Sequence, residues 1–230
     1  MDSRQEDLQV WILLLYLFIH FNYSNIHQLG AAEIDSKIIT TMFSRPFDGS
    51  ITPLFVGIFN LLGIYPLIYA SLLLPGSKRQ RIPALPFIVS SFALGFFGIG
   101  PYLGLREYNT DVKDEDRGRG SGIFESKMFI VVLSSFTYVL IRYAFEGTFD
   151  GDRLKSFLEL FQTQRLVQIS TIDFTILTLA LWDPVKEDMI RRNFNGVSAL
   201  DVCALPIIGP LSYLLVRDKL PSDKKKSTDI

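Results

Sequence analysis

The sequence predicts an all-α fold, a polytopic transmembrane helical bundle. Its apolar residues stand in long blocks, and its charged residues gather in the segments between them. Two of the blocks, residues 51–74 and 84–105, contain no charged residue. A helix of about 20 apolar residues can cross the hydrocarbon core of a bilayer. Both blocks reach that length, so we expect an integral membrane protein with the lipid bilayer as its first partner.

Five full spans are expected, at about residues 51–74, 84–105, 128–145, 166–182 and 197–216. These spans divide the 230-residue chain into three regions. Residues 1–50 hold a short N-terminal apolar helix and an amphipathic segment, residues 51–216 form the transmembrane bundle, and residues 217–230 form a basic tail.

The first apolar run, residues 10–21 (VWILLLYLFIHF), is too short for a standard span. The residues before it carry three acids against one arginine, whereas a secretory signal begins with a basic region. Three alternatives remain open for this run: a retained helix that spans or re-enters the membrane, an uncleaved interfacial helix, and a cleaved signal.

Two further segments have the spacing of amphipathic surface helices. Apolar residues recur at helical intervals within residues 34–43, and a proline follows at position 46. In residues 151–165 (GDRLKSFLELFQTQR) the leucines and phenylalanines share one side of a helix, which suits a membrane surface. Residues 106–122, by contrast, are charged and glycine-rich, so we expect a mobile loop there.

Glycine, proline and tyrosine recur near the ends of three expected spans, as GIYPLIYASLL, GIGPYLGL and IIGPLSYLL. A proline inside a membrane helix frees a carbonyl group, which neighbouring helices or hydroxyl groups must satisfy. We therefore expect a kink at each proline. A small excess of Lys and Arg in the tail and in the turn at residues 78–81 predicts a cytoplasmic or stromal C-terminus.

Several function classes are excluded by what the sequence lacks. The formal net charge of −1 predicts no nucleic-acid partner. One cysteine and two histidines are too few for a cysteine metal cluster or a membrane di-iron centre. Neither a P-loop, a dinucleotide-binding loop, a zinc-protease motif nor a nucleophile elbow occurs. We predict no metal and no cofactor, and leave room for a pigment or a lipid as ligand.

Polar residues inside the expected spans are the candidate functional residues. Asp173 and Asp201 lie near the starts of the fourth and fifth spans, and Asn60 lies within the first. An ionisable group in lipid is costly, so its first interpretation is functional, with Arg142 as one candidate partner. Both acids are candidates for catalysis, and both, together with Asn60 and Arg142, are candidates for ligand binding. Two alternatives stay open: a helix cap or interhelical bond, and a span that begins one turn later.

The runs FNLLGIYPLIYASLLLPGSKRQRIPALPFIVSSFALGFFGIGPYLGLRE and LWDPVKEDMIRRNF, with the ending ALPIIGPLSYLLVRDKLP, resemble an uncharacterised family of small multi-spanning membrane proteins of cyanobacteria and plastids. The likeness covers residues 59–220 apart from the loop at 108–121. The ending IIGPLSYLLVR is also similar to the last helix of the neoxanthin-synthase-like membrane proteins of plastids. The first resemblance implies a thylakoid or plastid membrane, and no established reaction.

Three functions are weighed against one another. The first is a non-catalytic accessory or assembly factor for a membrane protein complex, because catalytic arrays are missing while a charged loop and a basic tail suit contacts. The second is a metal-independent enzyme acting on a carotenoid or other isoprenoid, with an intramembrane acid as proton donor. The third is a small-solute transporter, for which kinked helices and polar groups at mid-membrane depth are typical.

Overall fold

The computed structural model describes residues 32–45, 47–118, 120–146 and 151–222. This part of the chain is helical and contains no strand, which confirms the predicted all-α class. The apolar run at residues 10–21 and the end of the basic tail lie outside it. The described helices belong to two compact units. The first comprises the described residues up to Gly63 and Ser135–Ile176, and the second comprises Ile64–Ser134 and the described residues from Leu177 onward.

Three helical stretches of the described residues are long and apolar enough to cross a membrane, fewer than the five expected. They are Pro53–Leu73, Lys127–Phe145 and Arg165–Arg191. The first two agree with the expected spans at 51–74 and 128–145. The third begins where the expected span at 166–182 does, but its helix runs on for more than two further turns. The other two expected spans have a different structure, described below.

The first unit combines parts of these stretches with the two predicted amphipathic helices. Both amphipathic helices are present, as α2 (Ala32–Ser44) and α9 (Gly151–Thr163). With them pack α3 (Pro53–Leu62), the second half of α8 (Lys127–Phe145) and most of α10 (Arg165–Ala180). Arg165 at the start of α10 holds Asp35 of α2, with 2.9 Å between Nη2 and Oδ2.

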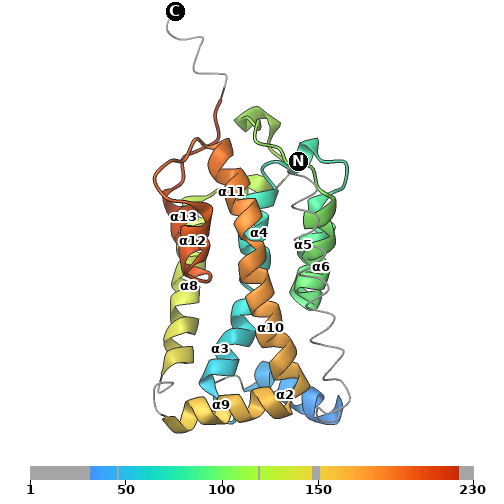
Figure 1. Ribbon diagram of the computed structural model, residues 1–230, viewed down its shortest axis with the longest axis vertical. Helices are drawn as coiled ribbons and strands as arrows, with labels where there is room; N and C mark the ends of the chain where they lie inside the picture. Colours follow the sequence, from blue (N-terminus) through green and yellow to red (C-terminus); the bar gives the residue numbers. More distant parts are fainter. Residues whose placement is uncertain (1–31, 46, 119, 147–150, 223–230) are drawn as a thin grey trace, which may run out of the picture. The chain divides into compact units, whose positions relative to one another are not determined.

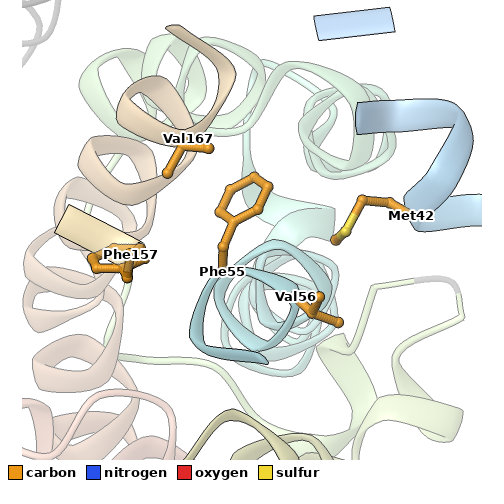
Figure 2. Packing of buried hydrophobic residues seen from close by; sticks show 5 residues of the cluster. All are labelled: Met42, Phe55, Val56, Phe157 and Val167. Atoms are coloured by element: carbon orange, nitrogen blue, oxygen red, sulfur yellow. The ribbon is translucent and has the colours of Figure 1, made fainter. Parts of the chain in front are cut away.

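A small apolar core joins four of these helices (Figure 2). Phe55 lies at its centre in the figure and is fully buried. Its neighbours come from α2, α3, α9 and α10 and are Met42, Val56, Phe157 and Val167. Gly57 of α3 is packed so tightly against Ala144 of α8 that a Cβ atom there would collide with it. Small residues permit this close approach of two helix backbones.

The expected span at residues 84–105 is wrong, because this segment is a helical hairpin. α5 (Ala84–Leu94) and α6 (Phe96–Leu105) lie side by side in the second unit (Figure 1). Gly95 reverses the chain with φ 54°, a conformation that glycine adopts without strain. A Cβ atom on Gly98 would lie 2.5 Å from the backbone nitrogen of Ser91, so the two helices are in direct backbone contact.

Both ends of this hairpin are tied together. Gln80, before α5, donates from Nε2 to the carbonyl of Glu107 at 2.6 Å, and its Oε1 accepts from the Glu107 amide at 2.8 Å. Arg79 donates to the carbonyl of Asp111 at 2.6 Å. The loop expected to be mobile at residues 106–122 is thus anchored at its start, and the hairpin begins and ends at one place.

The expected span at residues 197–216 is wrong for the same reason. The segment forms the short α12 (Ala199–Cys203) and then α13 (Ile208–Val216), which pack against each other. Ile207, with φ 61°, stands at the reversal. Gly209 approaches the carbonyl of Val202 so closely that any Cβ atom would collide with it.

The Gly-Pro segments therefore mark breaks and reversals more often than kinks. Pro66 lies in the first turn of α4 (Tyr65–Leu73), just after the helix is interrupted at Gly63, and Pro210 lies in the first turn of α13. Helices accept proline in the first turn because those amide groups lack intrahelical partners. Of the three prolines, only Pro101 stands in the interior of a helix, α6.

Candidate functional site

The helix that continues the third long stretch carries most of the buried charge. α11 (Trp182–Arg191) follows α10 directly and has the sequence WDPVKEDMIR. Asp183, Glu187 and Arg191 recur every four residues, so a helix places them on one face. Arg106 pairs with Asp183 and Glu187 on that face, while Asp188 pairs with Arg217, and Arg217 in turn pairs with Glu125. We call these side chains, together with Asp188 and Arg192, the ion network.

Arg106 binds two carboxylates of α11. It stands immediately after α6 and has only 3% of its side chain exposed. Its guanidinium donates to Asp183 at 2.5 Å and to Glu187. Burial alone would lower the pKa of Arg106, but the charges of Glu187 and Asp183 outweigh burial and raise it. The other oxygen of Glu187 accepts from the Asn109 amide at 2.7 Å, which draws the following loop to α11.

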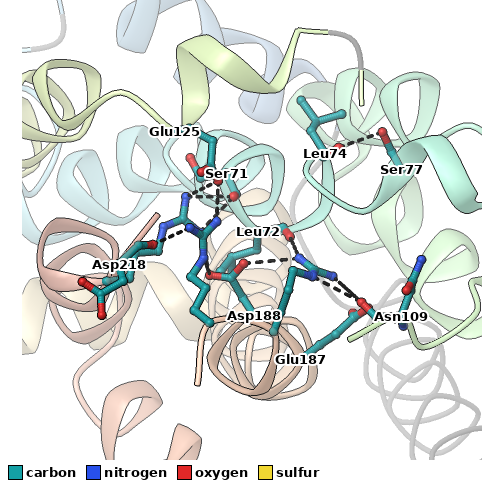
Figure 3. Close-up of polar contacts among 12 residues, drawn as sticks. Ser71, Leu72, Leu74, Ser77, Asn109, Glu125, Glu187, Asp188 and Asp218 are labelled. Atoms are coloured by element: carbon teal, nitrogen blue, oxygen red, sulfur yellow. Dashed lines mark hydrogen bonds and ion pairs between the residues drawn. The ribbon is translucent and has the colours of Figure 1, made fainter. Parts of the chain in front are cut away.

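Asp188 is the centre of the other half of the network (Figure 3). Its side chain is completely buried. Oδ2 accepts from Arg217 at 2.7 Å, from the Tyr213 hydroxyl at 2.9 Å and from Arg192 at 3.0 Å, and Oδ1 accepts from Arg191 at 3.3 Å. A buried carboxylate is stable only when it is paired and hydrogen-bonded in this way.

The arginines also satisfy carbonyl groups at the end of α4. Arg217 donates from both terminal nitrogens to the Ser71 carbonyl at 3.1 Å, and Arg191 donates to the Leu72 carbonyl at 3.3 Å (Figure 3). The last carbonyls of a helix have no intrahelical partner and carry partial negative charge. Cations there stabilise the helix end, so the network joins α11 to the end of α4.

Glu125 extends the network to the chain segment after α13. It lies just after α7 (Ser121–Phe124) and accepts from Arg192 at 2.6 Å and from Arg217 at 3.0 Å. Arg192 also donates to the Asp218 carbonyl at 2.5 Å. Burial works against the charged form of Arg192, but Asp188 and Glu125 raise its pKa above the ordinary value.

The network contains four arginines and four carboxylates, so its formal charges cancel. Every carboxylate faces at least one guanidinium, and no arginine in it lacks a carboxylate. Such an arrangement fixes segments that are distant in the sequence. Removing one member would leave a buried charge without its partner, which typically costs about 3–5 kcal/mol.

The predicted site residues are distributed over both units. Asn60 donates to the Val56 carbonyl one turn earlier in α3, at 2.8 Å, and Arg142 lies on the exposed side of α8. Asp173 is buried in α10 within the first unit, whereas Asp201 belongs to the second. None of these four residues belongs to the ion network.

Asp201 is a helix cap. Its Oδ2 accepts from the Ser198 amide at 3.1 Å and from the Ser198 hydroxyl at 2.8 Å, and its own amide donates back to that hydroxyl at 3.1 Å. This is the reciprocal pattern of a capping box at the start of α12. The hydrogen bonds from Ser198 lower the pKa of Asp201, which is fully exposed. The cap, one of the open alternatives, is therefore the structural role of this acid.

Sequence reasoning missed the ion network because it assigned α11 to a loop after a span that ended at Trp182. A signal was present: the four-residue spacing of Asp183, Glu187 and Arg191 continues the helix. Arg106, the partner of Asp183 and Glu187, and Arg217, the partner of Asp188, lie far away in sequence, and no pattern within one helix indicates them. Within the described residues, no group of three His, Cys, Asp or Glu side chains is arranged to hold a metal ion.

Comparison with known proteins adds no relative: no family model, no curated protein and no solved structure matches the chain.

Proposed function

We propose that the protein is a non-catalytic integral membrane protein, an accessory or assembly factor of a membrane complex in a thylakoid or plastid membrane. The membrane system rests on the resemblance described above. The observation that carries the non-catalytic part is the ion network. Its charges neutralise one another and hold helix ends, which is the work of a scaffold rather than of a group that must gain or lose a proton.

A partner helix could bind α8. Only 28% of its most apolar stretch is buried, against 67% for the Pro53–Leu73 stretch. Val131, Val132, Phe136 and Val139 are among its exposed apolar side chains. Such a surface suits lipid tails or the apolar face of another membrane helix.

The proposed orientation places the C-terminus on the cytoplasmic or stromal side. If the three long stretches cross and the two hairpins do not, residues 78–127 and the residues after 186 share one side. Most of the Lys and Arg residues outside the ion network lie in these two segments. The side of a membrane protein that is richer in Lys and Arg usually stays in the cytoplasm.

The experiment that tests this function is co-purification of the affinity-tagged protein from its own membranes in a mild detergent, followed by blue-native electrophoresis. The expected result is migration with a larger complex. Matched variants sharpen it: Val132→Arg with Phe136→Arg, on the exposed side of α8, should release the partner, while Arg142→Gln should not. Migration only as a free monomer, with no co-purifying protein, would contradict the proposal.

A small-solute transporter is the second candidate, because the structure adds an observation in its favour. The Pro53–Leu73 stretch is broken between α3 and α4, and two apolar segments reverse as hairpins. Discontinuous membrane helices are typical of transporters. Flux of candidate solutes into liposomes that contain the purified protein would support it.

The isoprenoid enzyme keeps only Asp173 as its intramembrane acid, because Asp201 caps an exposed helix start. Unchanged pigments in a deletion strain would remove this function.

A further inference from the structure

A pocket of about 430 Å³ lies between α11 and the beginning of α12. It is separate from the ion network, because none of the network's side chains lines it and the network's acids on α11 lie on the opposite face of that helix. Its lining combines cationic, aromatic, amide and apolar side chains, among them Trp182, Lys186, Ile190, Asn193, Asn195 and Leu200. Pockets of this size, mostly apolar with a few polar groups, are typical of small-molecule sites.

The end of α11 shapes one wall of the pocket. Asn193 adopts φ 51°, its amide donates to the Ile190 carbonyl at 3.1 Å, and the Phe194 amide donates to the Met189 carbonyl at 2.9 Å. These two bonds form the motif with which helices commonly end. Phe194 then packs edge-on against Tyr213, with 5.2 Å between ring centroids. The pocket wall is therefore fixed by backbone bonds and by an aromatic contact.

Lys186 supplies the positive charge of the pocket. It lies over the Trp182 ring, with 5.1 Å between Nζ and the ring centroid, and makes no ion pair with any described carboxylate. The acids on either side of it in α11, Asp183 and Glu187, are bound by arginines. Ser198 also lines the pocket, but its hydroxyl is engaged by Asp201. An anion in the pocket would thus find an available ammonium group.

The position along the chain places this pocket at headgroup depth. The stretch Arg165–Arg191 has 27 residues, which as a helix is about 40 Å long and exceeds the roughly 30 Å of hydrocarbon. Trp182 stands where its apolar part ends and its charged part begins. Tryptophan and lysine at such a boundary are characteristic of the membrane interface.

The rim of the pocket is apolar and exposed. Ile190, Val197 and Leu200 have 49%, 51% and 64% of their surface accessible. A soluble anion would gain nothing from this rim, whereas a lipid could lay the beginning of its acyl chains against it. One phospholipid has groups for each part of the pocket: its phosphate for the cation, its glycerol for the asparagine amides, and its acyl chains for the apolar rim.

We propose that this pocket binds the headgroup of an acidic phospholipid. Lys186 pairs with the phosphate. The side-chain amide of Asn193 and the second N–H of the Asn195 amide, whose first donates to the Asn193 carbonyl at 3.2 Å, donate to phosphate or glycerol oxygens. The apolar rim receives the upper acyl chain. A lipid headgroup and inorganic phosphate both present a phosphate anion to the pocket, so the test must separate the two.

The chain has two tryptophans, and Trp11→Phe leaves Trp182 as the only fluorophore of this kind. The protein is placed in nanodiscs of phosphatidylcholine with a rising fraction of brominated phosphatidylglycerol or, in parallel, of brominated phosphatidylcholine, and quenching of Trp182 is followed. We expect half-quenching at about five-fold lower mole fraction for phosphatidylglycerol, the size of the attraction of one lysine to a lipid with net negative charge. Lys186→Gln should abolish the preference, while Lys78→Gln, an equal loss of charge at another exposed lysine, should keep it.

Equal quenching by the two lipids in the parent protein would overturn the proposal, and so would a preference that survives Lys186→Gln. In a third arm, inorganic phosphate is added at millimolar concentration. Retained quenching supports a lipid site. Relief of quenching by free phosphate would show a general phosphate site and would overturn the assignment to a lipid.

Discussion

The Oδ2 atom of Asp188 lies 2.7 Å from Nη1 of Arg217, although 29 residues separate them in the chain. The same guanidinium donates to the Ser71 carbonyl at the end of α4. One arginine after the last helix thus joins α11 to α4. The neighbouring Arg192 completes the arrangement, because it contacts both Asp188 and Glu125.

Asp188→Asn should destabilise the second unit by about 3–5 kcal/mol, because it leaves the surrounding guanidinium groups without their buried counter-charge. The measurement is unfolding of the purified protein in detergent, followed by circular dichroism and by loss of the monodisperse peak. Asp111→Asn is the matched control, since that aspartate contributes only its backbone carbonyl to Arg79 among its described contacts. Equal stability of the two variants would contradict a structural role for Asp188.

Gly98→Ala and Gly209→Ala should each destabilise the protein by about 1–3 kcal/mol through overpacking, because a methyl group at either position meets backbone atoms of the preceding helix. Gly122→Ala is the control: it lies in α7, and a Cβ atom there would meet nothing within 4 Å. Thermal unfolding of the three variants checks the prediction. Tolerance of alanine at both hairpin glycines would argue against the packed hairpins.

The hairpin at residues 84–105 predicts a specific topology. In a Cys203→Ser background, single cysteines at Lys78 and Asp111 should react with a membrane-impermeant maleimide from the same side, since the loops at both hairpin ends are bonded to each other. A cysteine at Asp48, before the Pro53–Leu73 stretch, should react from the other side. If Lys78 and Asp111 react from opposite sides, the segment crosses the membrane.

The sequence was sufficient for the all-α class, for the two amphipathic helices and for three of the long apolar stretches, because each depends on local periodicity. It was insufficient for residues 84–105, where hydropathy and length are those of a span. The reversal there depends on the left-handed conformation of Gly95 and on backbone contact at Gly98. Hydropathy measures neither property. It also does not register the close backbone contact of Gly209 with Val202.

The candidate site was harder to predict for a related reason. A single acid in an apolar run, such as Asp201, attracts attention because lipid penalises it. The structure places this acid at an exposed helix start, where Ser198 donates hydrogen bonds to it. The charges that are actually buried, such as Arg106 and Glu187, belong to charge-rich segments that look solvated in sequence. Their burial follows from pairing between distant segments, which one sequence does not display.

Asp201 should contribute to stability in a pH-dependent way. Hydrogen bonds from Ser198 hold its folded pKa below the ordinary value of 3.8, so its contribution is present above that value and is lost as the pH falls through the folded pKa. Asp201→Asn should therefore lower the melting temperature slightly at about pH 6, and the difference from the parent protein should shrink toward about pH 3. Melting curves of both proteins across this range check it. A difference that grows on acidification would contradict the assignment of Asp201 as a charged cap.

A double-mutant cycle at Glu125 and Arg217 tests most directly whether the ion network is a neutral scaffold. These two side chains lie 3.0 Å apart, and replacing both removes one charge of each sign. Glu125→Gln and Arg217→Gln should each cost about 3–5 kcal/mol, and the double variant should recover at least about 1 kcal/mol relative to their sum while it still assembles with the partner complex. Strict additivity, or a double variant that is as stable as the parent protein but no longer assembles, would contradict the account.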